Sequence, residues 1–201
     1  MTLDQFGWNE FFAQQINDAD GESYAARVWR QDINQYHLMS EQGNLIGTLP
    51  GKFRNQAYSK SDMPVVGDWV LVNPVIGGER GTVQIDRLLN RKTKFSRKEA
   101  GDVVDEQIVA SNIDYVFIVS GLDADFNAFR IERYLLLSWE SGATPIIVLN
   151  KADVCSDIDE KLRVLEPIAQ GTPILVISAQ DNIGFAPLNE YIQPGKTCAL
   201  L

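Results

Sequence analysis

The sequence predicts an α+β chain with two parts, a small five-stranded β-barrel followed by an α/β domain built on a parallel sheet. Between residue 22 and about residue 90, short stretches rich in β-branched and aromatic residues alternate with glycine-containing turns, as in small closed barrels. From about residue 105, longer apolar runs alternate with helical patterns, which is typical of a parallel sheet covered on both faces. This change in the pattern of apolar residues therefore separates the two parts.

The first part begins with apolar residues at helical spacing, so residues 1–20 are expected to form an N-terminal helical extension that docks on the body. Residues 21–90 are expected to form the barrel, and the oligonucleotide-binding (OB) type is the five-stranded barrel that fits best. The strands expected in it are residues 23–30, 35–39, 44–49, 68–72 and 81–85.

A basic stretch follows the barrel, and we interpret residues 91–105 as a basic linker. The net charge of −9 lies entirely in residues 102–201, which hold 15 acids and 6 bases, whereas residues 1–101 are neutral. No acid interrupts residues 87–98, so this stripe is either a contact for an RNA phosphate backbone or a solvated linker. The candidate RNA-binding residues are Arg87, Arg91, Lys92, Lys94, Arg97 and Lys98.

Residues 106–201 form the second part, in which strands and helices alternate. Helices are expected over residues 129–141, 157–170 and 185–192. Strands are expected at residues 114–120, 144–149, 173–177 and 196–201. Ligands of such sheets bind outside the carboxyl ends of the strands.

Two of the expected strands end in polar tips that together suit a guanine ring. The tips are Asn150-Lys151-Ala152-Asp153 and Ser178-Ala179. An ionised Asp153 can accept hydrogen bonds from both N1–H and the exocyclic amine of guanine, a donor pair that adenine lacks. Asn150 can donate to the base or brace a loop, the stem of Lys151 can cover the ring face, and the Ala179 N–H can reach O6. A guanine nucleotide is therefore the predicted ligand.

Three alternatives stand beside that interpretation. The first tip could be only a polar turn that opens a helix, because Asn and Asp are frequent in turns. The chain could also be an OB-fold RNA-binding module whose α/β half is a scaffold that binds no nucleotide. An α/β enzyme of another class is disfavoured, because the sequence offers no nucleophile–base pair and its one histidine, His37, falls in the barrel.

The order of these features resembles one family. A barrel, a basic stretch, Ser111-Asn112-Ile113-Asp114 leading into a strand, the two polar tips and then Pro194-Gly195-Lys196-Thr197 are similar to the circularly permuted GTPases of the ribosome small subunit-dependent GTPase A (YjeQ/RsgA) family. The resemblance covers essentially the whole chain, and residues 106–201 would be the first, incomplete half of the permuted GTPase domain. One departure is Ser111, where the family often has alanine.

The resemblance implies a GTP hydrolase that binds GTP or GDP with Mg²⁺ and assists late maturation of the small ribosomal subunit. It also implies contacts with ribosomal RNA and a structural Zn²⁺ in a C-terminal module that these 201 residues do not include. The glycine-rich phosphate loop of the family would follow the last expected strand, so we expect a piece of a longer protein that hydrolyses no GTP by itself. No catalytic residue and no metal ligand are expected within it.

Composition narrows the other possibilities. No run of about 18 apolar residues predicts a membrane span, and the N-terminus lacks the pattern of a secretory signal. Cys155 and Cys198 have no metal-type spacing and are expected to be reduced thiols. We expect a cytoplasmic monomer.

Overall fold

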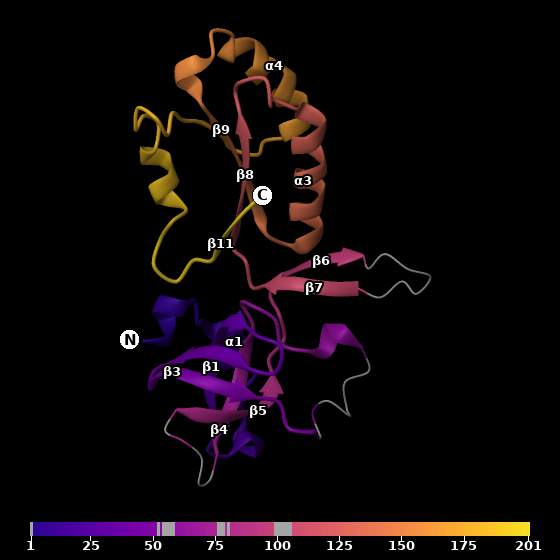
Figure 1. Cartoon of the computed structure of the whole chain (residues 1–201), viewed down its shortest axis with the longest axis vertical. Helices are drawn as coiled ribbons and strands as arrows, with labels where there is room; N and C mark the ends of the chain where they lie inside the picture. The colour runs from indigo at the N-terminus through magenta and orange to yellow at the C-terminus, as the bar shows by residue number, and fades with distance from the viewer. Residues whose placement is uncertain (1, 52, 54–58, 76–78, 80, 99–105) are drawn as a thin grey trace. The chain divides into compact units, whose positions relative to one another are not determined.

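The computed structural model describes residues 2–51, 53, 59–75, 79, 81–98 and 106–201. The chain divides into two compact units, Met1–Asn112 and Ile113–Leu201 (Figure 1). The first unit holds the barrel and a β-hairpin, and the second holds a parallel sheet with its helices. The α+β class and both types of sheet predicted from the sequence are confirmed.

The barrel of the first unit is closed, with strand order β1-β2-β3-β5-β4 and β4 paired back to β1. All neighbours are antiparallel except β3 and β5, which is the arrangement of an OB-type barrel. Its strands are β1 (Tyr24–Gln31), β2 (Tyr36–Ser40), β3 (Gly43–Thr48), β4 (Trp69–Pro74) and β5 (Thr82–Leu88).

Strand β4 shows why the barrel needs the N-terminal segment, residues 2–20. Val70 and Val72 point into the barrel core, and the alternate residues Trp69 and Leu71 are equally buried on the outer side. The N-terminal segment supplies the cover: Phe12 is 2% exposed, and the ring centroid of Trp8 lies 4.8 Å from that of Trp69. The docking expected for residues 1–20 is therefore present.

That segment is broken into short pieces rather than forming one helix. They are the 3₁₀ turn η1 (Leu3–Phe6), the helix α1 (Glu10–Ala13) and the 3₁₀ turn η2 (Asp18–Asp20). Gly7, at φ 92°, ends the first piece, and the side chains of Asn9 and Asn17 cap the next two. The caps at the ends of these short pieces thus prevail over the helical spacing of the apolar residues, which predicts one longer helix.

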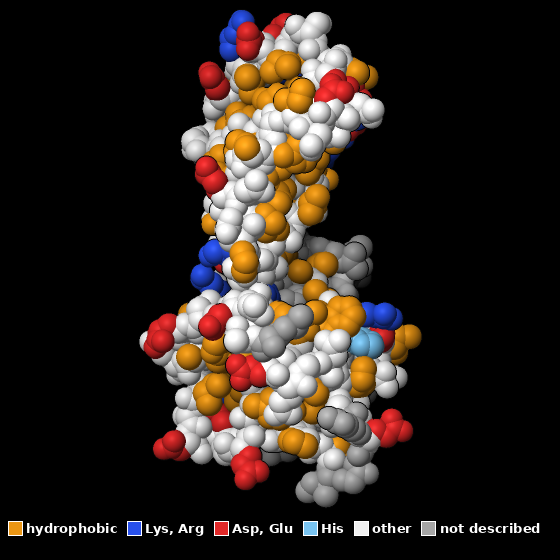
Figure 2. Space-filling model, turned by 90° about the vertical axis from the view of Figure 1, so that its left-hand side faces the viewer, with side chains coloured by type: hydrophobic (Ala, Val, Ile, Leu, Met, Phe, Trp, Pro, Cys, Tyr) orange, Lys and Arg blue, Asp and Glu red, His pale blue; other side chains and the backbone are white. Residues whose placement is uncertain are grey.

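The single histidine lies on the barrel surface, where it is pale blue in Figure 2 beside basic and acidic side chains. His37 Nε2 is 2.8 Å from Asp32 Oδ2, and its ring packs on Trp29 with centroids 5.5 Å apart. Asp32 also pairs with Arg30. These contacts are in keeping with the structural role expected for His37.

The stretch expected to be a linker contains a strand. Strand β6 (Lys94–Lys98) pairs antiparallel with β7 (Glu106–Ser111), and residues 99–105 between them lie outside the described residues. Ala110 in β7 also bridges Val66, just before β4. The hairpin therefore belongs to the barrel unit, which extends to Asn112.

A buried ion pair attaches the end of this hairpin to the barrel. Asp68 is 0% exposed and accepts two hydrogen bonds from Arg91, at 2.8 Å from Nε and 2.7 Å from Nη2. Ser111 donates its hydroxyl to the same carboxylate, and the Val65 N–H donates to it at 2.8 Å. Ser111 thus completes the hydrogen bonding of a buried charge, and a buried charge without these partners would be destabilising.

The second unit contains a four-stranded parallel sheet of order β10-β9-β8-β11. Its strands are β8 (Tyr115–Gly121), β9 (Thr144–Asn150), β10 (Ile174–Val176) and β11 (Cys198–Leu200). The helical elements between them are α3 (Ala128–Ser141), η4 (Ala152–Val154), α4 (Ile158–Ala169) and η5 (Ala186–Glu190). The four strands lie where the sequence predicts strands, and α3, α4 and η5 lie where it predicts helices, although η5 is a 3₁₀ helix. The turn η4 is an additional element.

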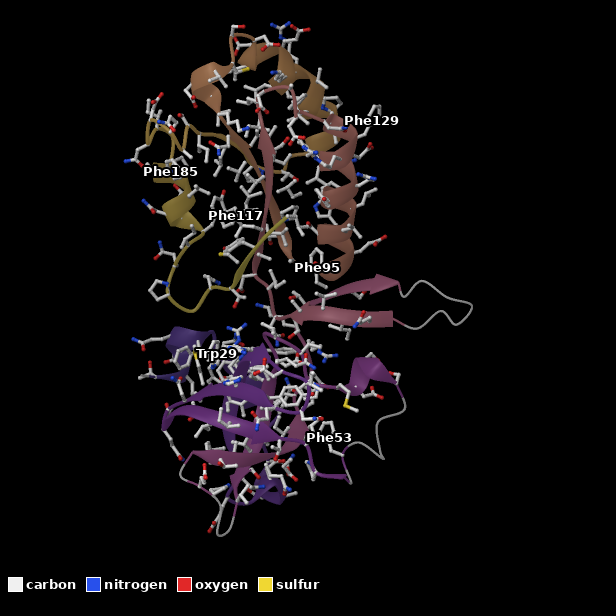
Figure 3. All side chains as sticks on the ribbon, viewed as in Figure 1. Trp29, Phe53, Phe95, Phe117, Phe129 and Phe185 are labelled. Carbon is white, nitrogen blue, oxygen red and sulfur yellow. The ribbon has the colours of Figure 1, made fainter. Side chains whose placement is uncertain are left out.

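Both faces of this sheet are covered. Helix α3 packs against β8, β9 and α4 on one face, with Ile131 and Leu135 buried. On the other face Phe117 of β8 packs with residues around η5, including Phe185 (Figure 3). This double cover explains why β9 is a continuous apolar run, and it leaves the carboxyl ends of the strands as the accessible edge.

Candidate nucleotide-binding site

The two polar tips lie side by side at the carboxyl ends of neighbouring strands. Asn150 ends β9, and Ser178 follows Ile177, whose N–H still donates to Leu149 of β9 at 2.8 Å. The Ala152 N–H donates back to the Ile177 carbonyl at 3.1 Å. The sheet therefore brings together two segments that are far apart in the sequence.

Asn150 braces the second tip. Its Oδ1 accepts hydrogen bonds from the Lys151 N–H at 2.7 Å and from the Ala179 N–H at 3.0 Å. Among the described residues, its Nδ2 has no hydrogen-bond partner. The brace matches one of the two roles expected of Asn150, whereas the Ala179 N–H expected to reach guanine O6 here donates to Asn150.

Asp153 is oriented by a buried residue that follows β10. Ser178, which is 2% exposed, donates its hydroxyl to Asp153 Oδ1 at 2.6 Å. The Ser178 hydroxyl in turn accepts from the Asp181 N–H at 3.1 Å, which fixes its direction. The second oxygen, Asp153 Oδ2, bonds to none of the described residues, and the side chain lies at the surface. One carboxylate oxygen is thus held while the other remains available to a donor.

The turn behind the second tip depends on a glycine. Gly184 has φ +83°, and a Cβ there would lie 2.3 Å from the carbonyl oxygen of Val176. The Ser178 N–H and carbonyl both bond to Ile183 at 3.0 Å, which closes the turn. Any side chain at position 184 would displace the backbone that presents Ser178.

Lys151 has an ion-pair partner that the sequence reasoning did not identify. Its backbone is left-handed, at φ 68° and ψ 38°, and its Nζ lies 2.6 Å from Oδ2 of Asp123 in the loop after β8. The hydrogen bond between them raises the pKa of the Lys151 ammonium and lowers the pKa of the Asp123 carboxyl. Asp123 lies 28 residues before Lys151, and no sequence pattern marks it as a partner.

The tripeptide Gly195-Lys196-Thr197 does not form a phosphate loop. The phosphate-loop pattern requires glycine five positions before the second glycine, and position 190 is Glu. The Thr197 N–H donates to Asp114 Oδ2 at 2.9 Å, and Lys196 Nζ lies 3.8 Å from Asp114 Oδ1. Because Asp114 precedes β8, the tripeptide lies at the amino ends of the strands, opposite the polar tips.

The structure gives two of the six basic residues of the stripe partners within the barrel unit. Arg87 pairs with Asp20 at 2.7 Å and donates to the Gln15 carbonyl, and Arg91 pairs with the buried Asp68. Lys92 and Lys94 are exposed. The other members, Arg97 and Lys98, belong to β6, and their side chains lie outside the described ones. The two arginines nearest the barrel therefore have structural partners within it.

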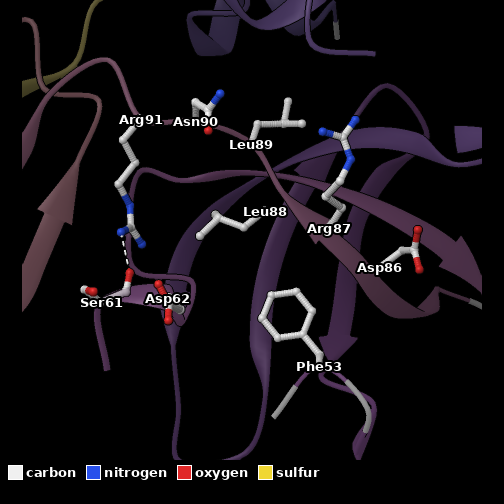
Figure 4. Close-up of a pocket in the computed structure, with 9 residues that line it drawn as sticks. All are labelled: Phe53, Ser61, Asp62, Asp86, Arg87, Leu88, Leu89, Asn90 and Arg91. Atoms are coloured by element: carbon white, nitrogen blue, oxygen red, sulfur yellow. Dashed lines mark hydrogen bonds between the residues drawn. The ribbon is translucent and has the colours of Figure 1, made fainter. Parts of the chain in front are cut away.

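A pocket of about 540 Å³ lies in the barrel unit, and none of the residues that line it belongs to the polar tips (Figure 4). Its walls come from the end of β5 and from the segment between β3 and β4. The residues that line it are Phe53, Ser61, Asp62, Asp86, Arg87, Leu88, Leu89, Asn90 and Arg91. The guanidinium groups of Arg87 and Arg91 are already paired with Asp20 and Asp68, so we assign this pocket no ligand.

Other candidate centres are not seen in the described part of the chain. It contains no group of three or more His, Cys, Asp or Glu side chains that could hold a metal ion. Cys155 and Cys198 are both free thiols. No helix among the described residues is long and apolar enough to span a membrane.

An OB-type barrel followed by a parallel sheet with these strand tips has the fold of a circularly permuted GTPase. The crystal structure of YjeQ from Thermotoga maritima aligns with a TM-score of 0.70 and 27% identity, covering 89% of this chain and 59% of that one. The structure of YloQ, described as a circularly permuted GTPase, aligns with a TM-score of 0.64 at 17% identity, which supports the fold alone.

Sequence comparison identifies the family. The model of the RsgA GTPase family matches residues 88–201. The small ribosomal subunit biogenesis GTPase RsgA of Opitutus terrae is 36% identical over all of this chain, and RsgA 2 of Listeria monocytogenes is 38% identical. The chain therefore belongs to the RsgA GTPase family, and it spans 57% and 55% of the lengths of these two relatives.

Proposed function

We propose that this chain supplies the guanine-recognition half and the RNA-contacting barrel of a GTPase that acts in biogenesis of the small ribosomal subunit. The observation that carries the proposal is the pairing of Ser178 with Asp153, together with the brace between Asn150 and Ala179. These contacts hold an acidic acceptor and a neighbouring backbone loop at the ligand-binding edge of a parallel sheet. The names of the relatives support the cellular role.

Guanine selectivity would come from the free oxygen of Asp153. A carboxylate accepts from N1–H and the exocyclic amine of guanine, whereas adenine would leave it desolvated without a donor. The Nδ2 group of Asn150 has no partner among the described residues and is placed to donate to the base. Ala152 and Ala179 are small residues beside these groups, which lets the ring approach the backbone.

The 201 residues alone are proposed to hydrolyse no GTP. Phosphoryl transfer depends on a phosphate-cradling loop, a lysine and magnesium, and the sequence contains no glycine-rich loop of that pattern. The described side chains also form no cluster suited to Mg²⁺ or Zn²⁺, so we assign neither ion to these residues. GTP or GDP would therefore bind weakly, through contacts with the base.

Ribosomal RNA is the proposed partner of the barrel unit. Lys92 and Lys94 are exposed near the start of the β6–β7 hairpin, and Arg97 and Lys98 continue the strand. Binding of this kind is mainly electrostatic, so it would weaken steeply with salt. A cytoplasmic location and a monomeric state are part of the same proposal.

One alternative keeps the RNA-binding role and removes the nucleotide. In that case the α/β unit would be a scaffold, and the tips would be turns that satisfy their own hydrogen bonds. The double acceptance by Asn150 Oδ1 favours this alternative, because it occupies the Ala179 N–H. The absence of a described partner for Asp153 Oδ2 favours guanine binding instead.

The test is a titration of the ¹⁵N-labelled chain with GDP and with ADP, followed by NMR, which detects millimolar affinities. We expect GDP to shift the amides of residues 150–153 and 178–181 in a saturable way, and ADP to shift them much less. Asp153→Asn should remove the preference for GDP, whereas Asp159→Asn, which removes the same charge from an exposed position on α4, should keep it. Equal responses to GDP and ADP would refute the guanine site.

A further inference from the structure

Lys151 occupies an unusual backbone conformation that its side-chain partner helps to explain. Left-handed backbone is uncommon for residues other than glycine, and it is retained where the surroundings stabilise it. Here the Lys151 N–H donates to Asn150 Oδ1, and the side chain reaches Asp123 of the neighbouring β8 loop at 2.6 Å. The backbone turn and the ion pair therefore fix Lys151 at both ends.

Gly121, the last residue of β8, leaves room for this pair. A Cβ at position 121 would lie 2.5 Å from Oδ1 of Asp123 and 3.6 Å from Cδ of Lys151. Gly121 is not among the glycines with positive φ, so what its missing Cβ provides is space for the Asp123 carboxylate in this position. Gly121 also faces Asn150 in the register of β8 and β9, which places it at the base of the first tip.

The loop that carries Asp123 is itself held at three further points. Lys161 of α4 donates from Nζ to the Leu122 carbonyl at 2.6 Å. Arg130 of α3 pairs with Asp125 at 2.7 Å and also donates to the Asp125 carbonyl. The Leu122 N–H donates to the Asn150 carbonyl at 2.8 Å. Asp123 is thus presented to Lys151 from a loop tied to both helices and to the strand that ends in the first tip.

The ion pair contributes little to folding stability by itself. The Lys151 and Asp123 side chains are 52% and 33% exposed, and ion pairs at such positions are strongly screened by water. Global stability therefore does not explain why three features converge on this contact: a glycine whose Cβ would displace the Asp123 carboxylate, a left-handed lysine and a tethered loop.

We propose that Asp123 is a positioning residue for guanine recognition, which holds the Lys151 ammonium so that the lysine stem is fixed as a wall of the base pocket before nucleotide arrives. The inference rests on the proposed guanine site and adds a residue to it. A long side chain that is already ordered loses less conformational freedom on binding, so the contact would strengthen GDP binding without touching the nucleotide.

The test is a double-mutant cycle on GDP affinity, read by the same NMR titration of the 201-residue chain. Asp123→Asn should weaken GDP binding about three- to tenfold, the range expected when one long side chain must be ordered on binding. Lys151→Met keeps an apolar stem but removes the ammonium, so Asp123→Asn added to Lys151→Met should have no further effect. The thermal midpoint of Asp123→Asn should stay close to that of the parent.

Two more variants separate positioning from a general effect of charge. Gly121→Ala should reproduce the effect of Asp123→Asn, because the new methyl group displaces the carboxylate. Asp159→Asn removes a carboxylate from an exposed position on α4, outside these contacts, and it should leave GDP affinity unchanged. A titration of the Lys151 ¹³Cε signal provides a direct readout of the contact. The pKa of the Lys151 ammonium should fall toward the ordinary lysine value in Asp123→Asn.

The possible outcomes distinguish this inference from the proposed function. The guanine site stands if the parent chain binds GDP selectively and Asp153→Asn removes that selectivity. The positioning role is nevertheless wrong if Asp123→Asn leaves GDP affinity unchanged. It is also wrong if Asp123→Asn weakens GDP binding as much in the Lys151→Met background as in the parent. If GDP shows no selectivity in the parent chain, the guanine site and the positioning role fall together.

Discussion

Ser178 donates its hydroxyl to Asp153 across 2.6 Å, although 25 residues separate them in the sequence. Ser178 is buried just after β10, so the carboxylate is oriented from the sheet rather than from its own turn. The contact occupies one carboxylate oxygen and leaves the other toward solvent. In the proposed complex, the free oxygen and the remaining lone pair of the held oxygen would accept the two donors on the guanine edge.

Removing this hydroxyl should weaken guanine binding without unfolding the chain. A hydrogen bond to a charged group contributes more than a neutral one, but the Asp153 side chain is exposed, so we expect Ser178→Ala to lose about 1 kcal/mol, or about fivefold in GDP affinity. Ser156→Ala, at an exposed serine nearby in the chain, is the matched control. An unchanged affinity in Ser178→Ala would show that the orientation of Asp153 does not depend on this contact.

The buried carboxylate of Asp68 predicts a stability effect in the barrel unit. Ser111→Ala would remove one donor from a fully buried charge, and the expected loss is about 1–3 kcal/mol in the free energy of unfolding. Urea unfolding should show a lower midpoint for Ser111→Ala than for Ser96→Ala on the neighbouring strand of the hairpin. Equal midpoints for the two variants would contradict the role given to Ser111.

The basic stripe predicts two kinds of phenotype. Lys92→Gln and Lys94→Gln should each weaken RNA binding and reduce the slope of log affinity against log salt by about 1, as expected for a lost phosphate contact. Arg91→Gln should instead lower the unfolding midpoint, because it leaves Asp68 buried without its cation. The control is Arg163→Gln on α4, which should alter neither property. Filter-binding titrations at several salt concentrations measure the slopes.

Cys198 should react slowly with alkylating reagents. Burial in β11, with a smaller contribution from Asp114, raises the pKa of its thiol above the ordinary value. Less thiolate is therefore present near pH 8 than in an unfolded chain, and the rate should rise only at higher pH. Iodoacetamide labelling followed by mass spectrometry checks this. A folded-state rate as fast as that in urea would contradict it.

The larger elements could be predicted from the sequence because their signals are local. The apolar run that becomes β9 and the helical period of α3 need no knowledge of distant partners, and both elements appear where expected. The sequence predicts one N-terminal helix, but the structure has three short pieces, because Gly7 ends the first and the side chains of Asn9 and Asn17 begin the next two as N-caps.

The details that the sequence did not reveal depend on contacts between distant residues. Arg91 looks like its basic neighbours, and only the barrel shows that its partner is the buried Asp68. The pairing of β6 with β7 likewise depends on register rather than composition. The composition of residues 91–105 therefore predicts a basic linker, although β6 lies within them. At the candidate site, Asp123 lies beside Lys151 only because β8 and β9 end at the same edge.

The most direct test of the guanine site is a comparison of GDP with xanthosine diphosphate on the parent chain and on Asp153→Asn. Xanthine carries a carbonyl where guanine carries its exocyclic amine, so an asparagine could donate to that carbonyl and still accept from N1–H. The account predicts that the parent prefers GDP and that Asp153→Asn prefers xanthosine diphosphate. If the substitution leaves the preference unchanged, Asp153 does not contact the base, and the polar tips are structural turns.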